Sequence, residues 1–271
     1  PYLESILSVL PLCDEFIIVV GNSDDETRTK ILSLNSPKIK IIDTIWDEKL
    51  RAGGQILAQQ TNIALDAITG DWGFYIQGDE VLHEKYHEVV RAVMLRFKDD
   101  TNVDGLLFNY KHFYGSYDYL GESWGWYRRE IRVIRNNKNI FSYKDAQGFR
   151  KKPNRKLNVK LINAWMYHYG WVKDPRLMQR KIYNWYKFYK EEAWVNNNVV
   201  QEKEFDYSGV SSLELFQETH PKVMQPRIEK MNWKFNHDIS LKKYSTKEKA
   251  KRFLSNLLGY RIGEYKNYRI I

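Results

Sequence analysis

Apolar residues along the first hundred positions alternate between helical spacing and short continuous runs. The run 16–20, Phe-Ile-Ile-Val-Val, is typical of a strand buried in a parallel sheet, and an amphipathic helix is expected before it over 2–11. The same alternation predicts further strands at 39–42 and 72–77 and helices at 54–69 and 89–97. Such alternation indicates a parallel sheet with helices on both faces, and right-handed crossovers make it doubly wound.

The pattern changes after residue 100. Aromatic and basic loops, rather than helices, separate strands predicted at 103–110, 130–134 and 160–167, and a long helix is expected over 175–193. We therefore predict an α/β fold with a doubly wound mixed sheet, helices on both faces and a helical C-terminal extension. The two halves of the α/β domain are expected at 1–100 and 101–200, and the extension at 201–271.

Composition excludes several classes of protein. The chain has 271 residues, of which 43% are hydrophobic and 15% aromatic, too many for a disordered chain. Its single cysteine, Cys13, excludes an internal disulfide framework and fits a reducing compartment, so a cytoplasmic location is expected. No uninterrupted apolar run approaches the length of a membrane span. The chain opens at Pro1 inside a predicted helix, and we expect an N-terminal segment to precede it.

The positive charge is concentrated at one end of the chain. The formal net charge is +9, and residues 241–271 carry nine Lys and Arg against two Glu, so the rest is almost neutral. A nucleic-acid-binding protein more often spreads charge over a whole face, and no nucleic-acid partner is expected. A helix is predicted over 246–258, with Ser245 and Glu248 at capping-box spacing and Gly259 at its end.

This C-terminal helix has an apolar face flanked by lysines, which leaves two interpretations open. In the first, the apolar face docks on the α/β domain and the lysines are solvated. In the second, the basic rim rests on an anionic membrane surface, which predicts peripheral, salt-sensitive membrane contact. The apolar face consists of Ala250, Phe253, Leu254, Leu257 and Leu258.

Polar residues follow three of the predicted strands at the edge where open α/β sheets bind ligands. The strand 72–77 ends in Gln77-Gly78-Asp79-Glu80, and the strand 160–167 ends in His168. A carboxylate one glycine beyond a buried strand places an oxygen ligand for a divalent cation beside room for a bulky anion. The alternatives are an ordinary turn that caps the next helix and, for His168, a packed or hydrogen-bonded ring.

The strand 16–20 exits into an acidic loop, Asn22-Ser23-Asp24-Asp25-Glu26-Thr27. Helix capping needs only one or two of these residues. The others are suited to accept hydrogen bonds from a nucleoside, whose ribose hydroxyls and base N–H groups are donors. Capping and ligand binding remain equally open for this loop.

Residues 16–84 resemble the nucleotide-binding half of glycosyltransferase family 2, whose members have the GT-A fold. The resemblance rests on the acidic loop, on Asn62-Ile-Ala-Leu65 and Gly70-Asp-Trp72, and on Gln77-Gly-Asp-Glu80, which corresponds to the family's Asp-x-Asp-Glu motif. The segment Tyr167-His-Tyr-Gly-Trp171 is similar to a later strand whose His completes metal binding in many members. This chain departs from the family at Gln77 and at Gly21, where the family has Asp, and the family's first strand would precede Pro1.

The resemblance implies transfer of a sugar from a nucleotide-sugar, a UDP- or GDP-sugar, to an acceptor hydroxyl, with inversion. It implies a divalent cation, Mn²⁺ or Mg²⁺, held by Asp79 and His168. The donor would be bound by Asn22, Asp24, Asp25, Arg51, Gln77 and Gly78. The reaction needs a general base near the acceptor. Glu130 is preferred because it opens a strand, with Glu122 and Asp145 as alternatives.

Seven aromatic residues between positions 113 and 127 suit a saccharide acceptor, free or lipid-linked, because sugar rings pack on aromatic faces. The alternative is a satellite core under a long loop. Two other functions also stay open. One is a nucleotidyltransferase, which shares a doubly wound sheet and a metal carboxylate. The other is a GT-A-like binding protein that has lost activity, for which Gln77 is the best indication.

Overall fold

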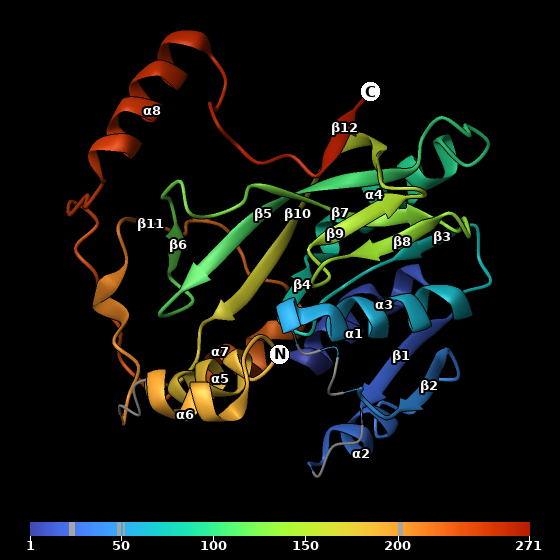
Figure 1. Cartoon of the computed structure of the whole chain (residues 1–271), viewed down its shortest axis with the longest axis horizontal. Coiled ribbons are helices and arrows are strands. Elements are labelled where there is room, and N and C mark those ends of the chain that lie inside the picture. The colour runs from blue at the N-terminus through green and yellow to red at the C-terminus, as the bar shows by residue number, and fades with distance from the viewer. Residues whose placement is uncertain (22–24, 48–49, 51, 200–202) are drawn as a thin grey trace.

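A computed structural model describes residues 1–21, 25–47, 50, 52–199 and 203–271 of the chain. Its helices and strands are arranged as a mixed α/β fold, as predicted (Figure 1). The helices are α1 (Tyr2–Val9), α2 (Thr27–Leu32), α3 (Gln55–Ala67), α4 (His87–Arg96), α5 (Pro175–Tyr186), α6 (Glu192–Asn198), α7 (Gln225–Glu229) and α8 (Thr246–Leu258). The strands are β1 (Phe16–Gly21), β2 (Ile39–Thr44), β3 (Trp72–Phe74), β4 (Glu80–Leu82), β5 (Gly105–Tyr114), β6 (Tyr119–Gly121), β7 (Arg129–Arg135), β8 (Ile140–Tyr143), β9 (Gly148–Lys151), β10 (Arg155–Trp171), β11 (Leu213–Leu215) and β12 (Tyr268–Ile270).

Ten of the described strands form one mixed sheet built around β5 and β10, which run parallel. β7 pairs antiparallel with β5, and β4 pairs antiparallel with β10. Alternate residues of β5 enter two hydrophobic cores, as the twofold repeat of a strand requires. Leu106 and Phe108 pack with Val90 of α4, whereas Leu107 belongs to a core that Leu65 of α3 covers. Helices therefore cover both faces of the sheet.

β1 and β2 form a separate, two-stranded parallel sheet. The expectation that β3 continues this parallel sheet is wrong, because β3 pairs antiparallel with β7. An apolar cavity of about 940 Å³ lies between β1, α3 and β3. The helix α3 bridges the two sheets by contacting both β1 and β8.

The C-terminal segment is less helical than expected. α7 and α8 are its only α-helices among the described residues, and two short strands return to the main sheet, β11 beside β6 and β12 beside β10. The long helix predicted over 175–193 ends at Tyr186, with α6 following from Glu192. In the part of the chain that the structure describes, no helix combines the length and apolarity needed to cross a bilayer.

Candidate active site

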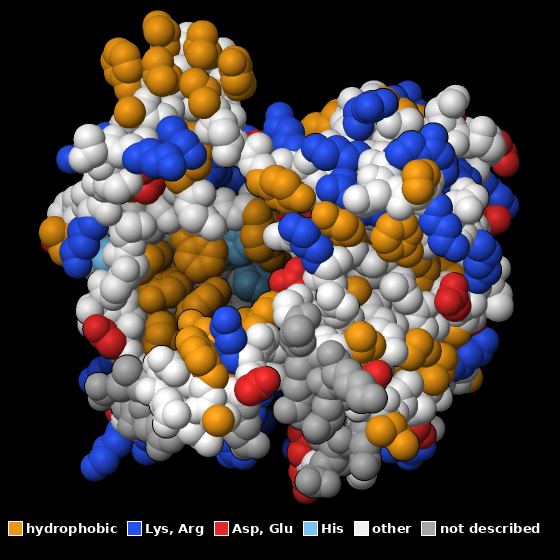
Figure 2. Space-filling model, viewed as in Figure 1, with side chains coloured by type: hydrophobic (Ala, Val, Ile, Leu, Met, Phe, Trp, Pro, Cys, Tyr) orange, Lys and Arg blue, Asp and Glu red, His pale blue; other side chains and the backbone are white. Residues whose placement is uncertain are grey.

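A cavity of about 1500 Å³ opens where residues 77–79 and the strands β7 and β10 meet α5 and the C-terminal tail. Figure 2 shows it as a deep recess lined by apolar side chains and a histidine. Of the residues predicted from the sequence to act in the site, six line this cavity. They are Gln77, Gly78, Asp79, Glu130, Asp145 and His168.

Sheet pairing brings Asp79 and His168 together. β4 and β10 are antiparallel, and Glu80 lies opposite His168. Asp79, which directly precedes Glu80, therefore lies next to His168 where this pairing ends. The Tyr169 amide donates a hydrogen bond of 2.8 Å to the Asp79 carbonyl, which fixes the approach. Asp79 Oδ1 then lies 3.7 Å from His168 Nε2.

Asp79 also forms an ion pair with Lys181 of α5, 3.0 Å from Oδ2, and the same ammonium donates to the Gly170 carbonyl at 2.8 Å. Burial opposes ionisation of Asp79, but the charges of His168 and Lys181 outweigh it and hold its pKa well below the usual range. Sequence reasoning did not include Lys181. It lies 102 residues from Asp79, and only the packing of α5 on the sheet joins them.

The ring of His168 contacts the ring of His112 on the neighbouring strand β5. The two Nδ1 atoms are 3.1 Å apart, and His112 Nε2 is 2.7 Å from the Tyr127 carbonyl oxygen. Burial and the adjacent His168 lower the pKa of His112 to about 3, so His112 is neutral at physiological pH. His112 was also missed from the sequence, although it occupies the register position on β5 beside His168.

Glu80, the other acidic residue of the motif, is not available to a ligand. It is fully buried, and both its oxygens accept from the Arg132 guanidinium, at 2.6 and 2.8 Å. Tyr110 donates a further hydrogen bond of 2.7 Å to Glu80. Gln77 contributes a neutral amide that donates to the Tyr75 hydroxyl at 3.2 Å.

The carboxylate oxygen of Asp79 and the imidazole nitrogen of His168 are the two candidate cation ligands at this point. Among the residues that the structure describes, no three His, Cys, Asp or Glu side chains gather as a metal site. One carboxylate and one imidazole fit a cation such as Mn²⁺ that takes its remaining ligands from phosphate oxygens and water. A cation at this place would take most of its ligands from outside the protein.

Glu130 is a carboxyl group with a perturbed pKa in the same cavity. Burial is the main cause that raises its pKa to about 7, and the neighbouring Glu80 adds to it while Arg132 opposes it. Its Oε2 atom is shielded from solvent and has no hydrogen-bond partner among the described residues. Such a group is close to half-ionised at neutral pH, as a general base should be.

The two alternative bases differ from Glu130. Asp145 lines the cavity and accepts a hydrogen bond of 2.9 Å from the Tyr189 hydroxyl. Glu122 bonds instead to residues of the C-terminal segment. Burial alone would raise the pKa of Glu122, but its hydrogen bonds outweigh burial and lower it to about 2. The donors are Lys242, Ser212, Tyr244 and Arg252.

The predicted donor-binding residues of the acidic loop are only partly described. Asn22, Asp24 and Arg51 lie outside the described residues. Asp25 Oδ1 accepts a hydrogen bond of 2.9 Å from the amide of Thr27, the first residue of α2, but the N-cap position of this helix is occupied by Glu26.

The aromatic residues between positions 113 and 127 fall into two groups, one in the hydrophobic cores and one at the cavity where a saccharide could bind. Phe113, Tyr114 and Tyr117 are buried in hydrophobic cores, as a satellite core would require. Trp124, Trp126 and Tyr127 line the cavity. Further rings come from distant parts of the chain and make the wall strongly aromatic, and they include Trp171, Trp185 and Trp233.

No family model and no curated protein matches this chain, so membership of glycosyltransferase family 2 is not confirmed. Among solved structures, the chain is similar to "Crystal structure of S. aureus TarS 1-349", with 14% sequence identity and a TM-score of 0.39. TarS is a glycosyltransferase. The match covers 74% of this chain and 63% of that one. At this identity and TM-score, the likeness does not extend to the role of any residue.

Proposed function

We propose that the protein transfers a sugar from a nucleotide-sugar to a hydroxyl group of a saccharide acceptor. One observation carries the proposal: a single large cavity holds both a half-ionised carboxyl, Glu130, and the Asp79–Lys181 ion pair with the His168 ring beside it. Inverting glycosyl transfer needs both features, a base for the acceptor hydroxyl and positive charge for the leaving diphosphate.

Glu130 is the proposed general base. Glu130 lines the cavity, and its pKa of about 7 lets it take a proton from a hydroxyl at neutral pH. Tyr127 lines the same cavity as Glu130, and the centre of its ring lies 6.4 Å from that of the His168 ring. The acceptor would therefore bind over Tyr127, with the donor on its Asp79 side.

The donor diphosphate is proposed to bind at Asp79, His168 and Lys181. Lys181 supplies an ammonium group there. Asp79 and His168 would hold a divalent cation, Mn²⁺ or Mg²⁺, which neutralises the diphosphate as it leaves. Lys173 adds positive charge to this wall, although burial and the nearby Lys181 lower its pKa.

The aromatic wall supports a saccharide as the acceptor, free or linked to a lipid. Trp124, Trp126 and Trp171 line the cavity with aromatic surface. Sugar rings offer flat C–H faces that pack on such surfaces, and aromatic rings contribute large contact areas at low entropic cost. The UDP- or GDP-linked class of donor is carried over from the resemblance of residues 16–84.

Ligand-induced thermal stabilisation tests the donor part of the proposal. The protein is heated with UDP, GDP, CMP or dTDP, each with and without Mn²⁺. Binding to the native state alone raises the melting temperature, by about 5 °C for a ligand at a hundred times its Kd. We expect one nucleotide to stabilise the protein and Mn²⁺ to add to the effect. Asp79→Asn should remove the Mn²⁺ increment, whereas Asp66→Asn, an exposed matched control, should keep it. The proposal would be contradicted if none of the four nucleotides raised the melting temperature above that of the protein alone.

A further inference from the structure

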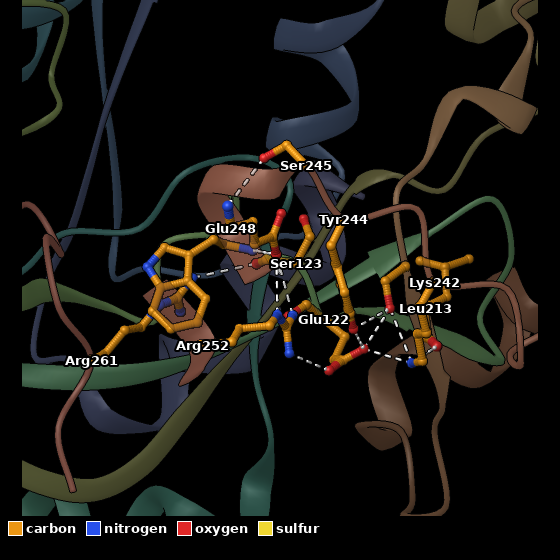
Figure 3. Close-up of polar contacts among 11 residues, drawn as sticks. Glu122, Ser123, Leu213, Lys242, Tyr244, Ser245, Glu248, Arg252 and Arg261 are labelled. Carbon is orange, nitrogen blue, oxygen red and sulfur yellow. Dashed lines mark hydrogen bonds and ion pairs between the residues drawn. The ribbon is translucent and has the colours of Figure 1, made fainter. Parts of the chain in front are cut away.

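The C-terminal helix α8 is attached to the protein through its polar side (Figure 3). Glu248 accepts a hydrogen bond of 2.9 Å from the Trp124 amide, and Arg252 forms an ion pair of 2.9 Å with Glu122. Ser255 is buried, and its hydroxyl accepts from the Ile262 amide at 2.9 Å. These polar residues of α8 lie on one side of the helix at three- and four-residue spacing.

The opposite, apolar side of α8 faces solvent. Phe253 is 70% exposed and Leu257 is 72% exposed. Leu254 and Leu258, on the same side, are 43% and 51% exposed. Figure 2 shows these side chains as an apolar cap at the end of the molecule. Of the two interpretations left open by the sequence, docking of this face on the α/β domain is therefore wrong. A helix that packs on a core buries its apolar side, whereas α8 exposes it.

Basic and aromatic residues surround this apolar face. Lys247 and Lys249 are exposed in the first turns of α8. Tyr260, the second residue after α8, is 62% exposed. Lysines beside an apolar helix face complement an anionic lipid surface, and tyrosines are enriched where membranes meet water. The net positive charge of residues 241–271 also favours contact with an anionic surface.

We infer that α8 binds the interface of an anionic bilayer, with Phe253 and Leu257 among the acyl chains and the lysines at the headgroups. A helix of 13 residues is roughly 20 Å long, too short to span a bilayer, so it lies in the plane of the membrane. Its polar side stays bound to the protein through Glu122 and Trp124. The inference does not depend on the proposed glycosyl transfer, because Phe253, Leu254, Leu257 and Leu258 are not among the residues that line the cavity.

Sedimentation with vesicles tests this inference on the full chain. The vesicles contain either phosphatidylcholine alone or equal parts of phosphatidylcholine and phosphatidylglycerol. We expect binding to the phosphatidylglycerol vesicles, and the double variant Phe253→Ser, Leu257→Ser should reduce the partition coefficient by about ten-fold or more. The matched control is Leu95→Ser, which removes an apolar side chain that is 67% exposed on α4 and should bind like the parent. Lys247→Gln, Lys249→Gln should weaken only the binding to anionic vesicles.

High salt separates insertion from charge attraction. Salt should weaken binding because it screens the charge of the lysines. The difference in binding between the parent and the serine double variant should remain at high salt, because it comes from the apolar contacts of Phe253 and Leu257. Equal binding of the parent and the serine double variant would overturn the inference. It would also be overturned if sedimentation velocity showed that the double variant converts a dimer to a monomer, because the face would then be covered by a second copy. Melting temperatures of both variants equal to that of the parent confirm that the fold is intact.

Discussion

His112 and His168 face each other across β5 and β10, with their Nδ1 atoms 3.1 Å apart. Neutral His112 donates its Nε2 hydrogen to the Tyr127 carbonyl, so its Nδ1 is an acceptor. The hydrogen between the two rings therefore belongs to His168 Nδ1. In neutral His168 the Nε2 lone pair then points toward Asp79, which is the tautomer that a metal ligand needs.

His112 is predicted to set the cation affinity without touching the cation. His112→Leu removes the acceptor that fixes the tautomer of His168, and loss of such an outer partner typically weakens metal binding about 10- to 100-fold. Mn²⁺ affinity in the presence of the stabilising nucleotide, measured by electron paramagnetic resonance, checks this. His112→Gln keeps an acceptor and should restore most of the affinity. Equal weakening by Leu and Gln would mean that His112 contributes only packing.

Lys181 is predicted to hold the donor diphosphate. Lys181→Met keeps much of the side-chain volume but removes the ammonium that lies 3.0 Å from Asp79. Nucleotide affinity measured by calorimetry should fall about ten-fold or more, because a charged hydrogen bond is lost in a partly buried site. Lys190→Met, an exposed lysine after the same helix, serves as the control and should bind as the parent does. A Lys181→Met protein with unchanged affinity would place the diphosphate elsewhere.

The raised pKa of Glu130 predicts how activity depends on pH. The base must be ionised, so kcat/KM should rise with pH and level off above an apparent pKa near 7. Glu130→Gln should lower the transfer rate about 100- to 10,000-fold while donor affinity stays the same, because the base acts only on the acceptor. If Asp145→Asn shows this pattern and Glu130→Gln does not, then Asp145 is the base.

The same pKa predicts a change in stability. Because the pKa of Glu130 is about 7 in the native state against an ordinary value of 4.5, the native state holds a proton that the unfolded chain releases between these pH values. The free energy of unfolding therefore falls as pH rises from 4.5 to 7, by about 3 kcal/mol from this group. Glu130→Gln should be more stable than the parent at pH 8, and urea unfolding at pH 5 and pH 8 measures the difference.

The pKa of Glu122 is lowered rather than raised, and we predict that Glu122 holds α8 on the protein through its ion pair with Arg252. Its pKa is about 2 against 4.5, so its contribution to stability is complete above pH 4.5 and is lost as pH falls toward 2. Glu122→Gln weakens the ion pairs with Arg252 and Lys242 and should speed amide hydrogen exchange in α8 at neutral pH. Glu88→Gln, on a highly exposed side chain, is the control. Unchanged exchange in Glu122→Gln would show that other contacts hold α8.

Local pattern was enough to predict most elements that precede the site. The apolar runs and helical spacing identify β1, β2, α3 and α4 because each is defined by neighbouring residues. The pairing of β3 could not be derived in this way, since its partner β7 lies about 60 residues later and strand order leaves no local signal.

Strand ends were the most useful signal for the site. Asp79 and His168 were singled out because each was predicted to follow a strand, and the structure brings them within 3.7 Å. The predicted strand end at His168 is wrong, because β10 continues to Trp171. Lys181 had no comparable signal, because it lies in the middle of a helix. The periodicity of α8 predicts an amphipathic helix but not which face packs. That choice depends on Glu122, which is 130 residues from its partner Arg252.

The central claim is that the cavity around Asp79 transfers a sugar from a nucleotide-sugar. The most direct measurement is release of nucleoside diphosphate from UDP- and GDP-sugars with Mn²⁺ and a saccharide acceptor, followed for the parent, Asp79→Asn and Asp66→Asn. We expect release from one class of donor, matched by sugar on the acceptor, with Asp79→Asn slower by about 100-fold or more and Asp66→Asn unchanged. Equal rates for Asp79→Asn and the parent, or no release from either class of donor that stabilises the protein, would contradict the account.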